Sequence, residues 1–402
     1  MKKLFFTVFL SLLVVGAYAQ KKTLKGAQKA LNKKDYATAI DLATQAAANP
    51  ETANNPQVYV VLGTSHIYQF DADKTNLPEA QSAFDNLQKA IELGDDKLKE
   101  KIMEAAIMNN EQLRLGGGEG LMFLQNLLNI QGNTHFEAAE YDKSYAYFKL
   151  STAITPDDIV MAFYTGYSAY AGELGDEIPL EYYTKVLELN KDLPEDSKFE
   201  STNFAYNGII DIYMARREDF DGALKYIRMA KEDYPEETSY DELEIDVLIK
   251  AEKMEEAIEG LKGVVASGDA TDFTFYRLAY LQWNNEEFDA ALESCDKALE
   301  LNPTYYDALY VAGSVLFNQA AEDLKAANNT DPSDIAGYDK FIADAKEKFK
   351  KAMPYFEKGI EVKPDDMYSL NPLSTIYDQL EMDAKRDVIL AKIDEIEAKG
   401  GE

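Results

Sequence analysis

The sequence contains a single cysteine, Cys295, and only two histidines, His66 and His135, in 402 residues. One cysteine cannot form a disulfide within the chain. Because no cysteine lies near either histidine in the sequence, neither a zinc site nor a histidine-based catalytic site is supported. We therefore expect a protein that is not an enzyme and has no cofactor and no metal. The histidines are expected to fill helix interfaces, and Cys295 to act as a small buried hydrophobe.

Positive charge is also scarce. The chain has 41 Lys and Arg against 72 Asp and Glu, a formal net charge of −31. Phosphate backbones require the opposite sign, so we expect no nucleic-acid partner. Acidity keeps a long surface soluble, which is the simpler interpretation, although it could also serve cationic partners or divalent ions.

Long apolar runs are limited to the N-terminus. Lys2 and Lys3 precede an apolar run over residues 4–15, and an A-x-A pattern ends at Ala19. This arrangement is typical of a secretory signal peptide, so residues 1–19 are expected to be cleaved after Ala19. We expect export to the periplasm or beyond the cell, with no membrane span, because no later run has the roughly 20 apolar residues that a spanning helix needs.

A spacing of 34 residues recurs in what remains. Phe220, Met254 and Phe288 are separated by this interval, and each begins the same pattern, in which residues three, seven and ten positions later are small, large and small. Pro235 and Pro303 close two of the copies. A fixed period of this length predicts stacked helix pairs, in which each proline ends the second helix.

Further copies extend the pattern toward both ends of the chain. They begin at Tyr36, Tyr141 and Phe349, and weaker copies lie near Ala83 and Tyr183. Two intervals hold extra material. We expect a helix over 97–114 followed by a glycine-rich hinge over 116–120, and a loop over 328–334 between two lengthened helices.

The pattern resembles that of the tetratricopeptide repeat (TPR) family. Residues 58–63 and 307–313 are similar to the family's first helix, and residues 288–303 to its second. The resemblance implies an all-α fold, a right-handed superhelical solenoid of about nine TPR-like helix hairpins with inserted helical segments and a C-terminal capping helix. We expect N-terminal repeats over 20–115, a main array with its capping helix over 116–398, and a disordered tail over 399–402.

The same resemblance implies a binding surface. In this family, positions two, five, nine and twelve of each repeat line the concave groove, and here they carry an excess of aromatic residues. The expected groove residues are Phe163, Tyr167, Tyr170, Phe273, Tyr276, Tyr280, Trp283, Tyr310 and Phe317. An equally strong interpretation is that some of them pack against neighbouring helices.

Aromatic side chains supply a large contact area at low entropic cost. We therefore expect a noncatalytic protein-binding or assembly scaffold of the cell envelope, which holds a segment of a partner protein in its groove. The alternative is a module that recognises a glycan or a cell-wall polymer by stacking sugars on the same aromatic residues.

Overall fold

The computed structural model describes residues 22–104 and 120–400. Helices and the turns between them account for this part of the chain, and no strand occurs in the described ranges. The all-α prediction is confirmed. The chain divides into two compact units, Met1–Arg217 and Glu218–Glu402, and each is considered by itself. The signal peptide and most of the glycine-rich hinge lie outside the described residues, as does the expected domain boundary after residue 115.

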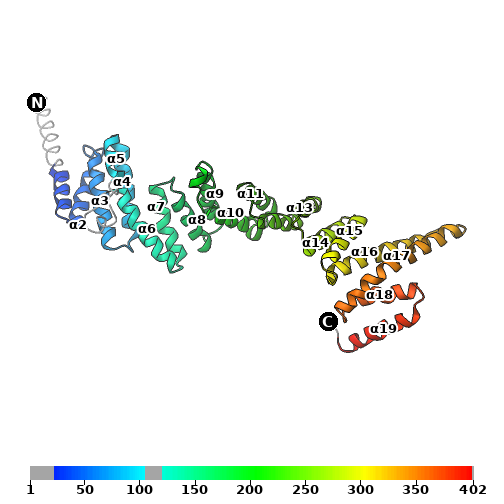
Figure 1. Ribbon diagram of the computed structural model, residues 1–402. Coiled ribbons are helices and arrows are strands. Elements are labelled where there is room, and N and C mark those ends of the chain that lie inside the picture. The colour runs from blue at the N-terminus through cyan, green and yellow to red at the C-terminus, as the bar shows by residue number, and fades with distance from the viewer. Residues whose placement is uncertain (1–21, 105–119, 401–402) are drawn as a thin grey trace, which may run out of the picture. The chain divides into compact units, whose positions relative to one another are not determined.

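Unit 1 begins with a helix over 22–32, and its helices pack in chain order (Figure 1). The elements that follow are α2 (Tyr36–Ala47), α3 (Pro56–Ala72), α4 (Leu77–Leu93), α5 (Asp96–Glu104), α6 (Leu121–Glu137), α7 (Tyr141–Ile154), α8 (Ile159–Ala171), α9 (Glu177–Lys191), the 3-10 helix η1 (Glu195–Ser197), α10 (Thr202–Asp211) and the π-helix η2 (Ile212–Arg216). The short α5 is the part of the expected inserted helix that the structure describes.

Unit 2 is also built of antiparallel helix neighbours. Its elements are α11 (Phe220–Asp233), α12 (Ser239–Lys250), α13 (Met254–Ser267), α14 (Asp272–Asn284), α15 (Phe288–Leu301), α16 (Tyr306–Asn328), α17 (Ile335–Val362), α18 (Met367–Gln379) and α19 (Asp383–Ala398). The loop expected near 328–334 separates the long helices α16 and α17. The expected capping helix is α19, which packs against α18.

In the three regular copies, the repeating pattern marks where the second helix of the pair begins. Phe220, Met254 and Phe288 are the first residues of α11, α13 and α15. Two residues before each of these starts, a glutamate has a positive φ between 51° and 62°. That left-handed residue reverses the chain between helices, and the proline that follows a helix prevents it from continuing. Accordingly, α11 ends two residues before Pro235, and α15 ends two residues before Pro303.

Glycine at selected positions lets paired helices approach closely. A methyl group in place of a hydrogen on Gly132 of α6 would lie 2.5 Å from the ring of Phe148 in α7. At Gly313 of α16 the same methyl would lie 2.8 Å from the ring of Phe356 in α17. Both rings are fully buried. The large residue of one helix therefore fills the space that glycine leaves on the other.

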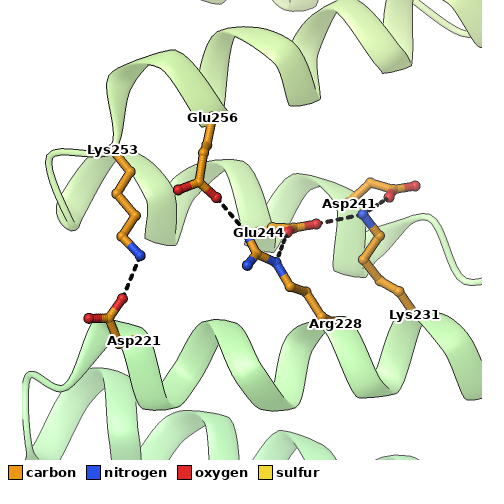
Figure 2. A network of polar contacts seen from close by, with 7 residues as sticks. All are labelled: Asp221, Arg228, Lys231, Asp241, Glu244, Lys253 and Glu256. Carbon is orange, nitrogen blue, oxygen red and sulfur yellow. Dashed lines mark hydrogen bonds and ion pairs between the residues drawn. The ribbon is translucent and has the colours of Figure 1, made fainter.

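Charged side chains join the first three helices of unit 2, as Figure 2 shows. Glu244 of α12 accepts hydrogen bonds from Nε of Arg228 at 2.7 Å and from Nζ of Lys231 at 2.6 Å, both on α11. Arg228 also donates to Glu256 of α13 at 2.8 Å. In the next repeat, 34 residues on, Leu278 occupies the position of Glu244. Between α11 and α12, charged side chains therefore make contacts at a position where the next repeat buries an apolar side chain.

None of the helices within residues 22–104 and 120–400 combines the length and the apolar character that crossing a membrane requires.

Candidate partner-binding site on helix α14

Helix α14 carries the densest group of the predicted aromatic residues. Its N-terminus is fixed by a capping box, in which Thr271 and Thr274 exchange hydrogen bonds between side chain and backbone. One face of the helix buries Leu278, Ala279 and Leu281. Because residues three and four apart share a face of a helix, the aromatic side chains at 273, 276, 280 and 283 form one stripe, which adjoins the buried face at Ala279.

The aromatic side chains of Phe273, Tyr276, Tyr280 and Trp283 form an unbroken series along α14, which we call the ladder. The ring centroids of successive members are 6.3 Å apart. The angles between successive ring planes are 36°, 41° and 80°, so the rings are tilted rather than flat against one another. The structure thus brings together four of the nine predicted groove residues.

The ladder has two anchored members and two exposed ones. Tyr276 and Trp283 pack against a core of buried residues from α14, α15 and α16, and Tyr276 also makes an edge contact with Tyr305 at 5.4 Å. Burial, followed by the nearby Asp307 carboxylate, raises the pKa of Tyr276. Phe273 and Tyr280 are 55% and 44% exposed. Large exposed aromatic side chains held by a rigid base are well suited to binding.

A charged contact borders the ladder on the side of α12. The guanidinium of Arg277 donates a hydrogen bond to Asp246 of α12 and lies 5.7 Å from the ring centroid of Phe273. Because Arg277 is already paired, it does not present a free positive charge beside the ladder.

A cavity of about 680 Å³ opens next to the first member of the ladder. Its wall includes residues of α12, α13 and α14, among them Ile245, Gly260, Gly263, Phe273 and Arg277. This volume lies within the roughly 300–1,000 Å³ range of ligand pockets. Phe273 belongs both to the ladder and to the wall of the cavity.

The remaining predicted residues of unit 2 make other contacts. Tyr310 of α16 stacks on Tyr306 at 6.5 Å and meets the exposed Tyr368 of α18 at 6.1 Å. Phe317 packs edge-on against Phe349 and Phe356 of α17. Phe317 therefore contributes to the contact between α16 and α17, whereas Tyr310 belongs to a second, partly exposed aromatic group.

In unit 1 the predicted residues belong to an aromatic cluster around α8. Phe163 is only 8% exposed and contacts the rings of Tyr167, Tyr183 and Phe199. In this conformation Phe163 packs the interior, as the second interpretation of the sequence allowed.

Tyr170, at the C-terminal end of α8, takes part in a polar contact. Its hydroxyl donates to Asp211 of α10 at 2.6 Å, and the guanidinium of Arg216 lies 4.5 Å from its ring centroid. Burial, and then the Asp211 carboxylate, raises the pKa of Tyr170. These contacts leave the ladder of α14 as the most exposed of the predicted groups.

Sequence reasoning missed the two glycines that open the cavity. Gly260 and Gly263 stand 34 residues after Tyr226 and Met229 of α11. Aligning the repeats position by position would have revealed the missing side chains. Reasoning from the aromatic positions alone could not, because it considers only the first helix of each repeat.

The two histidines each contact a glutamate, and the one cysteine is buried. His66 contacts Glu79 at 2.6 Å, and His135 contacts Glu140 at 2.6 Å. Burial raises the pKa of the Cys295 thiol to about 12. Within the described part of the chain, no three His, Cys, Asp or Glu side chains are grouped so that they could hold a metal ion.

Comparisons with known proteins indicate the family that two segments of the chain match. Residues 273–305 and residues 342–366 each match the tetratricopeptide repeat family. No curated protein matches this chain. The first matched segment contains the whole ladder and the Tyr305 ring that meets it.

Solved structures similar to this chain include several repeat proteins. A MamA protein is 21% identical, with 50% of this chain and 96% of that one covered and a TM-score of 0.38. YrrB, a TPR protein with an unusual peptide-binding site, is 21% identical, with 56% and 96% covered and a TM-score of 0.37. A TPR repeats protein from Bacteroides fragilis is 18% identical, with 63% and 98% covered and a TM-score of 0.32. Similarity at this level carries no argument about function.

The family assignment rests on the matched segments and on the arrangement of the helices. Helices begin at the residues that open the copies at Tyr36, Tyr141, Phe220, Met254 and Phe288, and at several positions glycine packs against a large side chain. Two segments of the chain match the family directly. This chain is a tetratricopeptide repeat protein.

Proposed function

We propose that this protein is a noncatalytic scaffold that binds a segment of a partner protein along the ladder of α14. One observation carries the proposal: Phe273 and Tyr280 are exposed, while Tyr276 and Trp283 hold them on a buried core. Fixed aromatic side chains lose little entropy on binding, so they are typical anchors of protein interfaces. The family match supports a protein partner.

The geometry of the ladder favours a protein segment over a glycan. Ring planes tilted by 36° to 80° present edges and clefts rather than one flat platform. Irregular side chains can fill such clefts, whereas sugar rings stack best on an open aromatic face. The bordering cavity, with its mixed apolar and charged wall, would also accept a side chain.

Replacing the two exposed ladder residues tests this proposal without disturbing the core. We expect the double variant Phe273→Ala, Tyr280→Ala to lose about tenfold or more of its affinity for the native partner, since an interface anchor contributes about 2 kcal/mol or more. Tyr338→Ala is the matched control, because Tyr338 is 45% exposed, close to the 44% of Tyr280, and lies on α17 away from the ladder.

The assay is crosslinking of the protein in its native cells, followed by mass spectrometry of the captured partners and a binding titration with the recovered partner. A discrete protein that is captured by the wild type and by Tyr338→Ala, but not by the double variant, supports the proposal. Equal capture by all three proteins contradicts it. Retention on polysaccharide with no protein partner would favour the glycan alternative.

We propose further that binding takes place outside the cytoplasm. The support is the pattern of residues 2–19, a charged start, an apolar run and an A-x-A site. The mass of the protein isolated from cells tests this: a chain that begins at Gln20 agrees with export, and a chain that retains residues 1–19 contradicts cleavage.

A further inference from the structure

Two glycines of one helix lie in the wall of the cavity beside α14. Gly260 and Gly263 lie one turn apart on α13 and both line the cavity. The equivalent positions carry Tyr226 and Met229 in α11, and Ser294 and Lys297 in α15. A Cβ atom added to Gly263 would meet nothing within 4 Å. A Cβ atom added to Gly260 would lie 3.2 Å from the Ile245 side chain, so the open space lies at Gly263.

The wall of the cavity is apolar in its deeper part and acidic around it. Leu261 and Ile245 are buried, and Val264 is half-buried. Glu242 of α12 and Asp269, which follows α13, also line the cavity and are exposed.

The two cations in the wall already have carboxylate partners. Lys231 pairs with Asp241 at 2.7 Å and with Glu244 at 2.6 Å, and Arg277 pairs with Asp246. The carboxylates of Glu242 and Asp269 therefore remain to attract a positive charge, in a protein whose formal net charge is −31.

Two helix N-termini open toward the same cavity, and by themselves they would favour an anion. Both are already balanced. Asp241 lies in the first turn of α12, and Asp272 opens α14 behind the capping box of Thr271 and Thr274. Carboxylates near helix N-termini compensate the partial positive charge, so the cavity keeps its preference for a cation.

We propose that this cavity binds a lysine or arginine side chain of the partner segment that lies on the ladder. The methylene stem would pack on Ile245, Leu261 and Val264, and the charged end would reach Glu242 and Asp269. Long cationic side chains combine an apolar stem with a charged tip in this way. Phe273 belongs to both the ladder and the cavity, so a segment on the ladder passes the cavity's mouth.

The inference rests on the proposed function, and it is tested with defined peptides on the full chain. The probes are fluorescent, end-capped peptides that repeat Leu-Ser-Xaa-Ala, with Lys, Gln or Glu as Xaa. We expect anisotropy titrations to show that the Lys peptide binds about tenfold or more tightly than the Gln peptide, and the Glu peptide least. Equal binding of the three peptides, preference for Glu, or no binding of the Lys peptide would overturn the inference.

Filling the cavity separates this site from general damage to the protein. Gly263→Leu places a side chain in open space and replaces a poor helix former, so the midpoint of urea unfolding should not fall. We expect it to weaken Lys-peptide binding about tenfold. Ala266→Leu is the control, because Ala266 is exposed on the same helix and does not line the cavity. Unchanged binding by Gly263→Leu overturns the inference.

Removing the acidic groups tests the charge. Glu242→Gln combined with Asp269→Asn should reduce the preference for Lys over Gln peptides, whereas Glu293→Gln, at an exposed position of α15 outside the cavity, should preserve it. If the ladder variant loses the native partner but Gly263→Leu does not affect the Lys peptide, the scaffold proposal stands and the cation site fails. If Gly263→Leu weakens Lys-peptide binding but the ladder variant keeps the native partner, the cavity accepts a cationic side chain, whereas the scaffold proposal for the ladder fails and with it the placement of the segment on the ladder.

Discussion

Two chemically identical substitutions in unit 2 should change stability in opposite directions. At Gly263 an added methyl meets nothing within 4 Å, so Gly263→Ala should stabilise the protein by about 0.5–1 kcal/mol through helix propensity. At Gly313 the methyl would lie 2.8 Å from the Phe356 ring, well inside the roughly 3.5–4.0 Å of a favourable carbon contact. Phe356 is fully buried and meets Phe317, so its ring cannot turn aside freely.

These contacts determine how far Gly313→Ala should lower the free energy of unfolding. Overpacking a helix contact costs about 1–3 kcal/mol, and the gain in helix propensity offsets about 0.5–1 kcal/mol of it, so Gly313→Ala should be destabilising by up to about 2.5 kcal/mol. Urea unfolding measures both variants through Trp283, the only tryptophan of the chain, which lies in the same unit. If both variants move the midpoint in the same direction, the assignment of close and open glycines is refuted.

Three further predictions concern other parts of unit 2. Burial alone would raise the pKa of Glu244, but hydrogen bonds from Lys231 and Arg228 outweigh it and lower the pKa. Glu244→Gln should therefore lower the free energy of unfolding by about 1–2 kcal/mol near neutral pH. This figure is kept small because Arg228 is half exposed, so solvent screens its contact with Glu244. The stabilisation from Glu244 is present above the pKa of its carboxyl in the unfolded chain, about 4.3, and is lost as the pH falls through its lower pKa in the folded protein. The urea midpoints of the variant and the wild type should therefore converge at acid pH. Cys295, whose pKa burial raises to about 12, should resist iodoacetamide in the folded protein and react after unfolding, as mass spectrometry would show. Ala257→Trp, at a fully buried position, should lower the thermal midpoint by overpacking that costs about 1–3 kcal/mol or more, and an unchanged midpoint would contradict the close packing of α13.

Much of the fold could be predicted from the sequence because helix pairs repeat local chemistry. Met254 begins α13 and Phe288 begins α15, as the 34-residue spacing indicates. Ala257 and Ala291 are fully buried, as small residues at a helix contact should be. The information lies within one repeat and its neighbour, so a single sequence is sufficient to find it.

The candidate site was less predictable, because exposure depends on what covers a side chain. Phe163 and Phe273 are both predicted groove residues, and the pattern treats the groove positions alike. In the structure, Phe199, from the segment between η1 and α10, packs on Phe163 at 5.4 Å. Phe273 is 55% exposed. Which aromatic residue remains free is decided by such connecting segments, whose path the repeat does not specify.

The helix pair α12 and α13 differs from the neighbouring repeats in two respects. Each glycine inside a helix costs about 0.5–1 kcal/mol relative to alanine, and α13 has Gly260 and Gly263 one turn apart. On α12, Glu244 occupies the position at which the next repeat buries Leu278 of α14. In a stacked array stability is close to a sum of repeat and nearest-neighbour terms, so neighbouring helices can sustain one weak pair. Random sequence changes alone could place such destabilising residues in any repeat of the array. Here the two glycines lie in the wall of the open cavity, beside the exposed Phe273 of the ladder, which is the position where a binding site would require them.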